Sequence, residues 1–144
     1  MSAEPRAARS RALIGLFLFG STGTLAELLL MEHLDSVTQW LPIAVLGAGV
    51  LAAAFLLADR SLARRTWAPL MAVFIATGLV GIGLHLYGNR AFELEVDPAS
   101  RGMQLLRETL MGATPAIAPG GLAFLGLLGL LAVRPGSSSR SGTP

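Results

Sequence analysis

The stretch GIGLHLYGNRAFELEVDPASRGMQLLRETLMGATPAIAPGG, residues 81–121, decides how this chain folds. It is the one long segment in which charged residues are interleaved with apolar ones. It starts inside an apolar run, passes His85, crosses a group of acidic residues and returns to an apolar run through a proline-rich turn. We therefore expect this stretch to leave a membrane and to re-enter it, while the other apolar runs pack around its two ends.

Composition places the whole chain among integral membrane proteins. Its 144 residues have a mean hydropathy of +0.62 and only 14% are charged, whereas about a quarter are charged in a typical soluble domain. The charges form short blocks, and between them lie apolar runs of about 20 residues, the length that an α-helix needs to cross a bilayer. We expect a single transmembrane domain over residues 12–133.

The residue types exclude several kinds of site. The chain has no cysteine, which excludes disulfides, thiolate metal ligands and cysteine nucleophiles. All 11 basic residues are arginine, so neither a Schiff-base lysine nor a phosphate-binding P-loop is available. The sequence pI near 10.4 would suit a nucleic-acid partner, but the arginines gather at the ends of apolar runs, where positive charge sets membrane orientation. No nucleic-acid partner is expected.

Four apolar runs predict an all-α, polytopic bundle of four transmembrane helices. The predicted spans are residues 12–31, 40–58, 66–87 and 113–133. A basic segment before the first run also resembles a signal peptide, but the run resumes after Glu27 and reaches full spanning length, which favours a retained helix.

Proline and tryptophan mark where the later spans begin. The second and third spans each open with a tryptophan and an early proline, as interfacial aromatic residues and first-turn prolines do. In the fourth span, Pro115 and Pro119 leave two alternatives: a bent entry, or a short helix that begins near Pro119.

Residues 88–112 are predicted to form a periplasmic cap. Gly88 and Asn89 tolerate the left-handed conformation that ends helices, and the following residues alternate apolar and acidic, which predicts an extended strip. The pair Asp97 and Pro98 then predicts the start of an amphipathic helix over residues 98–111. Its apolar face, with Met103, Leu106 and Leu110, is typical of a helix that lies in the headgroup layer.

The distribution of charge predicts the orientation. With four spans, both termini and residues 59–65 share one side, which carries eight arginines and two acids, a net charge of +6. The other side carries three arginines and seven acids, a net charge of −4. The excess of arginine predicts that both termini are cytoplasmic, in a bacterial inner membrane with the acidic loops in the periplasm. Residues 1–11 and 134–144 are expected to be disordered cytoplasmic tails.

Small residues predict where the spans approach one another closely. The expected packing positions are Gly15, Gly20, Gly23, Gly47, Gly49, Gly78, Gly81, Gly83, Gly121, Gly126 and Gly129. Gly81, His85 and Gly88 share one face of the third span. We therefore expect His85 to point toward another helix.

A group of polar residues near the outer ends of the first and third spans is the candidate cofactor site. The predicted topology puts His33 and His85 on the same side, and Glu27 and Glu32 lie close to His33 in sequence. Imidazole and carboxylate together suit zinc, iron or manganese, and two imidazoles also suit a b-type haem. The alternative is structural: Glu27 and His85 hydrogen-bond to each other and fix the register of the two spans, while His33 is a solvated loop residue.

The acidic residues Glu93, Glu95 and Asp97 form the second candidate site. A solvated acidic face is the default interpretation, and a surface that docks a partner or a cation is the functional one. The hydroxyl residues Ser21, Thr22 and Thr24 have no base near them in sequence, so no nucleophilic enzyme is expected.

The segments HLYGNRAFELE (residues 85–95) and GATPAIAPGG (residues 112–121) resemble those of a group of small four-span bacterial inner-membrane proteins. That group carries a His-x-x-Gly-Asn-x-x-Phe-Glu-x-Glu stretch and a Pro-Ala-x-Ala-Pro-Gly turn, in which Ile117 holds the variable place here. The similarity extends from about Glu27 to Ala132. It implies a four-span fold, and it implies no activity.

The leading functional hypothesis is a non-enzymatic accessory or scaffold subunit that presents its acidic cap to a membrane-protein partner or to another copy. One alternative is a metal- or haem-binding protein that uses His33, His85 and Glu27. A second is an oligomeric transporter of a small solute, which is disfavoured because four spans offer little pathway and show no inverted repeat.

Overall fold

The computed structural model describes residues 3–32, 36–58, 61–112 and 114–133, and this part of the chain is all-α, without a strand. Five helices follow one another: α1 (Ala3–Leu30), α2 (Val37–Leu57), α3 (Ser61–Val96), α4 (Gly102–Met111) and α5 (Gly120–Ala132). The predicted fold class is therefore confirmed at the level of an all-α protein.

Three of these helices, α1, α2 and α3, are long and apolar enough to cross a membrane. Helix α5 is equally apolar but has only 13 residues, about 20 Å at the rise of an α-helix. It begins at Gly120, after a series of turns that includes a hydrogen bond from the Gly120 amide to the Ile117 carbonyl (2.8 Å). Of the two alternatives for the prolines, the short helix that begins near Pro119 is confirmed.

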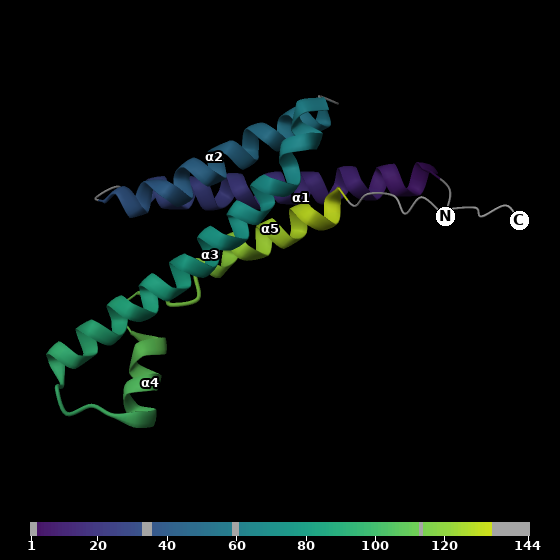
Figure 1. Ribbon diagram of the computed structural model, residues 1–144. Helices are drawn as coiled ribbons and strands as arrows, with labels where there is room; N and C mark the ends of the chain where they lie inside the picture. The colour runs from purple at the N-terminus through teal and green to yellow at the C-terminus, as the bar shows by residue number, and fades with distance from the viewer. Residues whose placement is uncertain (1–2, 33–35, 59–60, 113, 134–144) are drawn as a thin grey trace, which may run out of the picture.

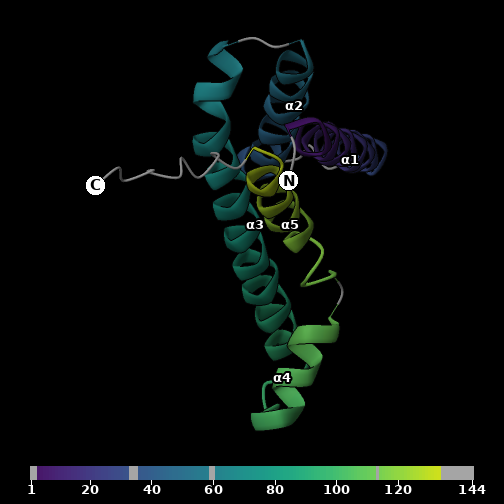
Figure 2. The ribbon, with the colours of Figure 1, turned by 90° about the vertical axis from the view of Figure 1, so that its right-hand side faces the viewer.

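The helices are arranged in two antiparallel pairs, α1 with α2 and α3 with α5 (Figure 1). The end of α2, the start of α3 and the end of α5 lie together at one end of the bundle, where α1 also begins. Helix α3 continues far beyond the other three, and α4 packs beside this projecting half (Figures 1 and 2). We call residues 86–112 the α3–α4 arm.

Aromatic side chains join the two pairs in the core. The ring of Phe17 on α1 packs edge-on against Trp67 of α3, with ring centroids 5.1 Å apart, and lies 5.3 Å from the ring of Phe74. All three rings are almost completely buried. Gly49 of α2 faces Phe17 and Phe74 where a larger side chain would collide with them, so three helices meet at this cluster.

Helices α3 and α5 approach each other most closely, because each presents glycines to the other. An added Cβ at Gly78 would lie 2.5 Å from the Ala123 amide nitrogen, and one at Gly126 would lie 2.7 Å from the Met71 carbonyl oxygen. The indole N–H of Trp67 donates a hydrogen bond of 2.8 Å to the Gly129 carbonyl. This bond fixes the register of the two helices.

The glycine prediction is confirmed at about half of the positions. Gly20, Gly49, Gly78, Gly81, Gly126 and Gly129 face atoms of another helix or of the segment that leads into α5, and leave no room for a side chain. An added Cβ would meet nothing within 4 Å at Gly15, Gly23, Gly47, Gly83 and Gly121. These five are not packing positions within one copy of the chain.

The predicted disorder of residues 1–11 is wrong from Ala3 onward, because α1 already begins there. This segment is rich in alanine and arginine, two of the best helix formers, and Pro5 falls in the first turn, where a missing N–H costs little. The predicted tail at residues 134–144 lies outside the described residues.

The predicted helix stop at Gly88 and Asn89 is also wrong. Helix α3 passes through both residues and continues to Val96, so Phe92, Leu94 and Val96 are helical and no extended strip exists there. A glycine within a helix costs about 1 kcal/mol relative to alanine. The side chain of Asn89 offsets that cost through the hydrogen bonds described below.

Helix α4 starts later than predicted, at Gly102 and not at Pro98. The Asp97 carboxylate accepts a hydrogen bond from the Ala99 amide (3.0 Å), and the Ser100 amide donates to the Asp97 carbonyl (3.1 Å). Asp97 therefore closes a tight turn, a role that competes with helix capping for this residue type. Gly102 then takes a φ of +57°, which glycine adopts without strain.

Candidate functional site

The α3–α4 arm contains most of the polar interactions that the structure describes. Helix α4 returns along α3 and is followed by the segment that leads into α5 (Figure 2). Three of the four buried polar residues in the described chain belong to the arm: Asn89, Ser100 and Thr109. The arm is thus held together by hydrogen bonds, whereas the bundle is held together by apolar packing.

Asn89 is the centre of this network, with 3% of its surface exposed. Its amide nitrogen donates to the carbonyls of Thr109 (3.0 Å) and Thr114 (2.8 Å). Its amide oxygen accepts from the Thr114 hydroxyl (2.7 Å) and the Thr114 backbone N–H (3.2 Å). One side chain therefore joins α3, the last turn of α4 and the connection to α5.

Gly112 makes room for this amide. An added Cβ at Gly112 would lie 2.8 Å from the Asn89 Cγ atom. The Thr109 carbonyl belongs to the last turn of α4, where backbone acceptors have no partner within the helix. Asn89 supplies that partner, which explains why α4 can end against α3 without an unsatisfied buried carbonyl.

His85 lies one helical turn before Asn89 and contacts the same connection. Its Nδ1 atom is 3.1 Å from the Pro115 carbonyl oxygen. Because a carbonyl only accepts, Nδ1 carries the proton in this hydrogen bond. One turn earlier, an added Cβ at Gly81 would meet the Pro119 ring at 2.6 Å. Gly81, His85 and Asn89 thus form a single face that holds residues 114–119.

A second set of hydrogen bonds closes the tip of the arm. The Ser100 hydroxyl, which is 2% exposed, donates to one carboxylate oxygen of Glu108 (2.9 Å). The Gln104 amide donates to the other oxygen of Glu108 (3.1 Å). Arg101 reaches the carbonyls of Pro98 and Ser100 at 3.4 Å each. The turn between α3 and α4 is therefore tied to the middle of α4.

Seven large apolar side chains of the arm are exposed, whereas Leu86, Leu94 and Leu105 are half-buried. The exposed ones are Tyr87, Phe92 and Val96 on α3 and Met103, Leu106, Leu110 and Met111 on α4. Met103 is 77% exposed. The predicted apolar face of α4 is thus the face that the rest of the protein leaves uncovered. Exposed large apolar side chains on both helices, beside buried polar ones, are typical of a surface that contacts lipid or another protein.

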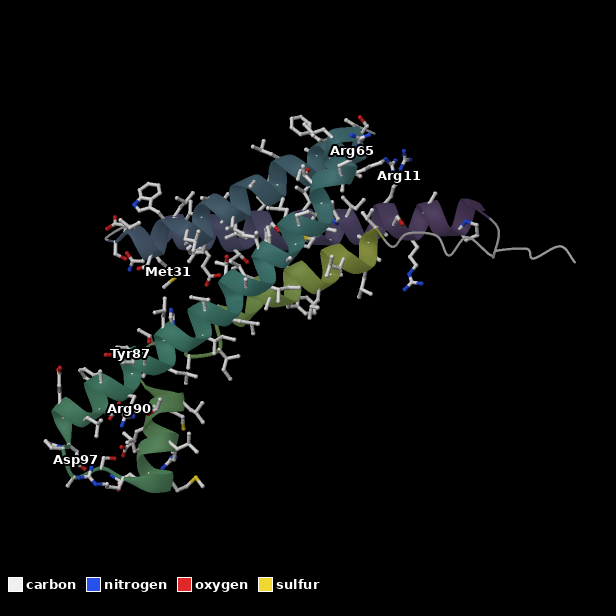
Figure 3. The ribbon with its side chains drawn as sticks, viewed as in Figure 1. Arg11, Met31, Arg65, Tyr87, Arg90 and Asp97 are labelled. Atoms are coloured by element: carbon white, nitrogen blue, oxygen red, sulfur yellow. The ribbon has the colours of Figure 1, made fainter. Side chains whose placement is uncertain are left out.

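The three acidic residues of the second candidate site do not share one face. Asp97 directly follows the last residue of α3, and its amide donates to the Glu93 carbonyl (2.8 Å), whereas Glu95 lies about 200° around the helix from Glu93. Glu95 and Asp97 are exposed, whereas Glu93 is half-buried. Figure 3 labels Asp97 at the tip of the arm and Arg90 nearer its base.

The residues of the predicted cofactor site are distributed over different surroundings. His85 is bonded to the connection that follows α4, and the side chain of Glu27 on α1 is exposed. Glu32 follows the end of α1 with a φ of +49°. His33 lies outside the described residues. Within the described ranges no three histidine or acidic residues are grouped so that they could hold a metal ion.

The structural roles of Asn89 and Thr114 are not among the predictions from the sequence. The signal was present, because Asn89 follows Gly81 and His85 at intervals of four residues and so extends their face by one turn. The backbone preference of Asn89 alone predicts a helix stop, and the side-chain partners that override it are distant in sequence.

Comparison with known proteins found no family model, no curated protein and no solved structure that matches this chain.

Proposed function

We propose that this chain is a four-span protein of a bacterial inner membrane, with both termini in the cytoplasm and the α3–α4 arm in the periplasm. Three helices have the length and apolarity of spans. Helix α5 packs along α3 through Gly126 and the bond between Trp67 and Gly129, and the turns before it lengthen the fourth span. The arginine excess at the opposite end from the arm favours this orientation.

Within this architecture, the chain serves as a non-enzymatic accessory or scaffold subunit that docks a membrane-protein partner through the arm. The observation that carries this proposal is that seven large apolar side chains of the arm are exposed while Asn89, Ser100 and Thr109 are buried. Large exposed apolar patches mark surfaces that contact lipid or another protein.

The two surfaces of the arm suit different neighbours. The face of α4 with Met103, Leu106 and Leu110 also carries Arg107, and a basic residue among apolar ones is typical of a helix in the headgroup layer. The Asn89 side chain binds the last turn of α4 through the Thr109 carbonyl. Asn89 follows Tyr87 by only two residues, and tyrosine is enriched at membrane–water interfaces. The acidic residues at the end of α3 are then available to the partner.

A charge-neutral variant of the arm tests the docking. Glu93→Gln, Glu95→Gln and Asp97→Asn together remove three charges, and asparagine keeps an acceptor for the Ala99 amide that Asp97 now binds. We expect this variant to lose covalent capture of the partner by a photo-reactive residue placed at position 96, an exposed position beside these acids, and to lose co-purification after mild detergent extraction. The matched control is Glu27→Gln with Glu32→Gln, which removes acidic charge from the exposed end of α1.

The docking proposal fails if the triple variant captures the same partner to the same extent as the wild type. It also fails if the variant and the control lose capture equally, because the effect would then depend on overall charge and not on the arm.

A further inference from the structure

One side of α4 combines exposed apolar side chains with a single arginine. Arg107 is exposed, and so are Met103, Leu110 and Met111, which lie three or four residues from it. Residues at these spacings share one side of a helix, and the exposed Leu106 lies beside them. We call these five residues the α4 face. They belong to one ten-residue helix, so their grouping does not depend on contacts between helices.

The acidic residue of α4 is turned away from this face. The Glu108 carboxylate accepts one hydrogen bond from the Ser100 hydroxyl (2.9 Å) and one from the Gln104 amide (3.1 Å). Its charge is therefore held by the tip of the arm. Among the described residues, no hydrogen bond or ion pair of Arg107 is found. The Arg107 guanidinium is thus available to a ligand that approaches the α4 face.

The contact between Asn89 and α4 sets the level of this face relative to the bundle. Asn89 follows Trp67 by 22 residues, about 33 Å along α3, whereas the hydrocarbon core of a bilayer is about 30 Å thick. With the arginine-rich start of α3 at the inner boundary, the Asn89 bond to the Thr109 carbonyl holds the last turn of α4 near the outer boundary. Helix α4 also lies across the direction of α1 and α2 (Figure 1), as a helix in the headgroup plane does.

We propose that the α4 face binds anionic phospholipids of the outer leaflet, with Arg107 on the phosphate group and the apolar side chains against the upper acyl chains. Guanidinium groups bind phosphate through paired, charge-assisted hydrogen bonds, and the aliphatic part of an arginine lies along apolar surface while its head reaches the polar layer. This inference rests on the proposed membrane arrangement and names the ligand of one surface of the arm. The acidic residues at the end of α3 remain the surface for the protein partner.

The full-length protein in lipid nanodiscs, without any partner, tests this site. A fluorophore on Met103→Cys reports on the α4 face, and the same fluorophore on Val96→Cys reports on the end of α3. Both positions are exposed, and the chain has no native cysteine. In discs of phosphatidylcholine with phosphatidylglycerol, a phospholipid that is spin-labelled near its headgroup should quench the fluorophore at position 103. Aqueous iodide should quench the fluorophore at position 96.

Substitution of Arg107 tests the contact with phosphate. One basic residue near an anionic membrane surface contributes roughly fivefold in affinity. Arg107→Gln should therefore lower the ratio of lipid-bound to free α4 roughly fivefold in discs with phosphatidylglycerol, and Arg107→Lys should keep most of it. The matched control is Arg101→Gln, because the Arg101 guanidinium reaches the carbonyls of its own turn, those of Pro98 and Ser100. This control should leave the ratio unchanged.

The lipid site is overturned if iodide quenches position 103 as strongly as position 96, because the α4 face would then lie in water. It is equally overturned if neither quencher reaches position 103, because a second copy would then cover the face. No loss in Arg107→Gln, or an equal loss in Arg107→Gln and Arg101→Gln, would show that Arg107 does not hold a phosphate group. Partner docking is measured separately by capture at position 96, so either proposal can fail without the other.

Discussion

At the scale of single residues, the side chain of Asn89 determines the shape of the arm. Its amide, which is almost completely buried, makes four hydrogen bonds to Thr109 and Thr114. A buried donor or acceptor left without a partner costs about 1–3 kcal/mol. The conformation of the connection between α4 and α5 is therefore more sensitive to this residue than to any of the exposed charges around it.

Replacement of Asn89 by alanine should loosen the arm without unfolding the bundle. We expect the free energy of local opening to fall by about 3 kcal/mol, which makes amide hydrogen exchange in α4 roughly a hundredfold faster. Exchange in α2 should not change. The control is Gln104→Ala, which removes one exposed hydrogen bond to Glu108. Equal protection of α4 in wild type and Asn89→Ala would show that the amide does not hold the arm.

The partners of single residues are harder to predict from the sequence than the helices are. His85 is predicted to point toward another helix, whereas its partner is the Pro115 carbonyl in the segment that precedes α5. The sequence did not place Glu27 correctly, because an acid near the end of a span is satisfied equally well by an interior partner or by exposure near the headgroups. Which of these occurs depends on the rotation of α1, and that rotation is set by Phe17 and its contacts with Trp67 and Phe74.

At the scale of elements, the pairing of α3 with α5 depends on glycine at the positions where their backbones meet. An added Cβ at Gly78 would lie 2.5 Å from the Ala123 amide nitrogen and 2.9 Å from the Pro119 carbonyl oxygen. Both atoms belong to the backbone and cannot move aside without displacing α5. Gly83, five residues further along α3, has nothing within 4 Å of an added Cβ.

These two glycines make a matched pair for a stability test. We expect Gly78→Ala to destabilise the protein by about 1–3 kcal/mol, as overpacking of a tight interface does. Gly83→Ala should be neutral or stabilising by up to about 1 kcal/mol, because alanine is the better helix former. The measurement is thermal unfolding in detergent, and similar changes for both variants would contradict the close packing of α3 on α5.

The sequence predicts helix boundaries well where a change in apolarity marks them. It predicts them badly where the contacts of a single polar residue set them. The runs that became α2 and the membrane part of α3 are visible in composition alone. The continuation of α3 to Val96 is not visible, because the alternation of Phe92, Leu94 and Val96 with acids satisfies a period of two while the tertiary contacts of Asn89 favour a helix. Local propensity and the local pattern both predict a non-helical segment after Gly88, whereas the hydrogen bonds of Asn89 to the distant Thr109 and Thr114 stabilise the helix.

At the scale of the whole molecule, the structure has two chemically different ends joined by an apolar bundle. One end carries the arginines at the starts of α1 and α3, and the other carries the arm with its hydrogen-bonded interior. The sequence alone is sufficient to predict this chemical difference between the two ends, because charge and the length of an apolar run are properties of short segments. It is insufficient for the arm itself, whose shape depends on contacts between α3, α4 and residues 114–119.

The most direct test of the account is the membrane topology, and the absence of native cysteine makes single-cysteine labelling clean. Leu62→Cys and Val96→Cys place exposed thiols at the two ends of α3, and a fluorescent reporter that matures only in the cytoplasm is fused after Pro144. We predict that an impermeant maleimide labels position 96 in spheroplasts, labels position 62 only after lysis, and that the reporter is fluorescent. Labelling of positions 62 and 96 from the same side, or a dark reporter, would contradict the four-span arrangement with an outer arm.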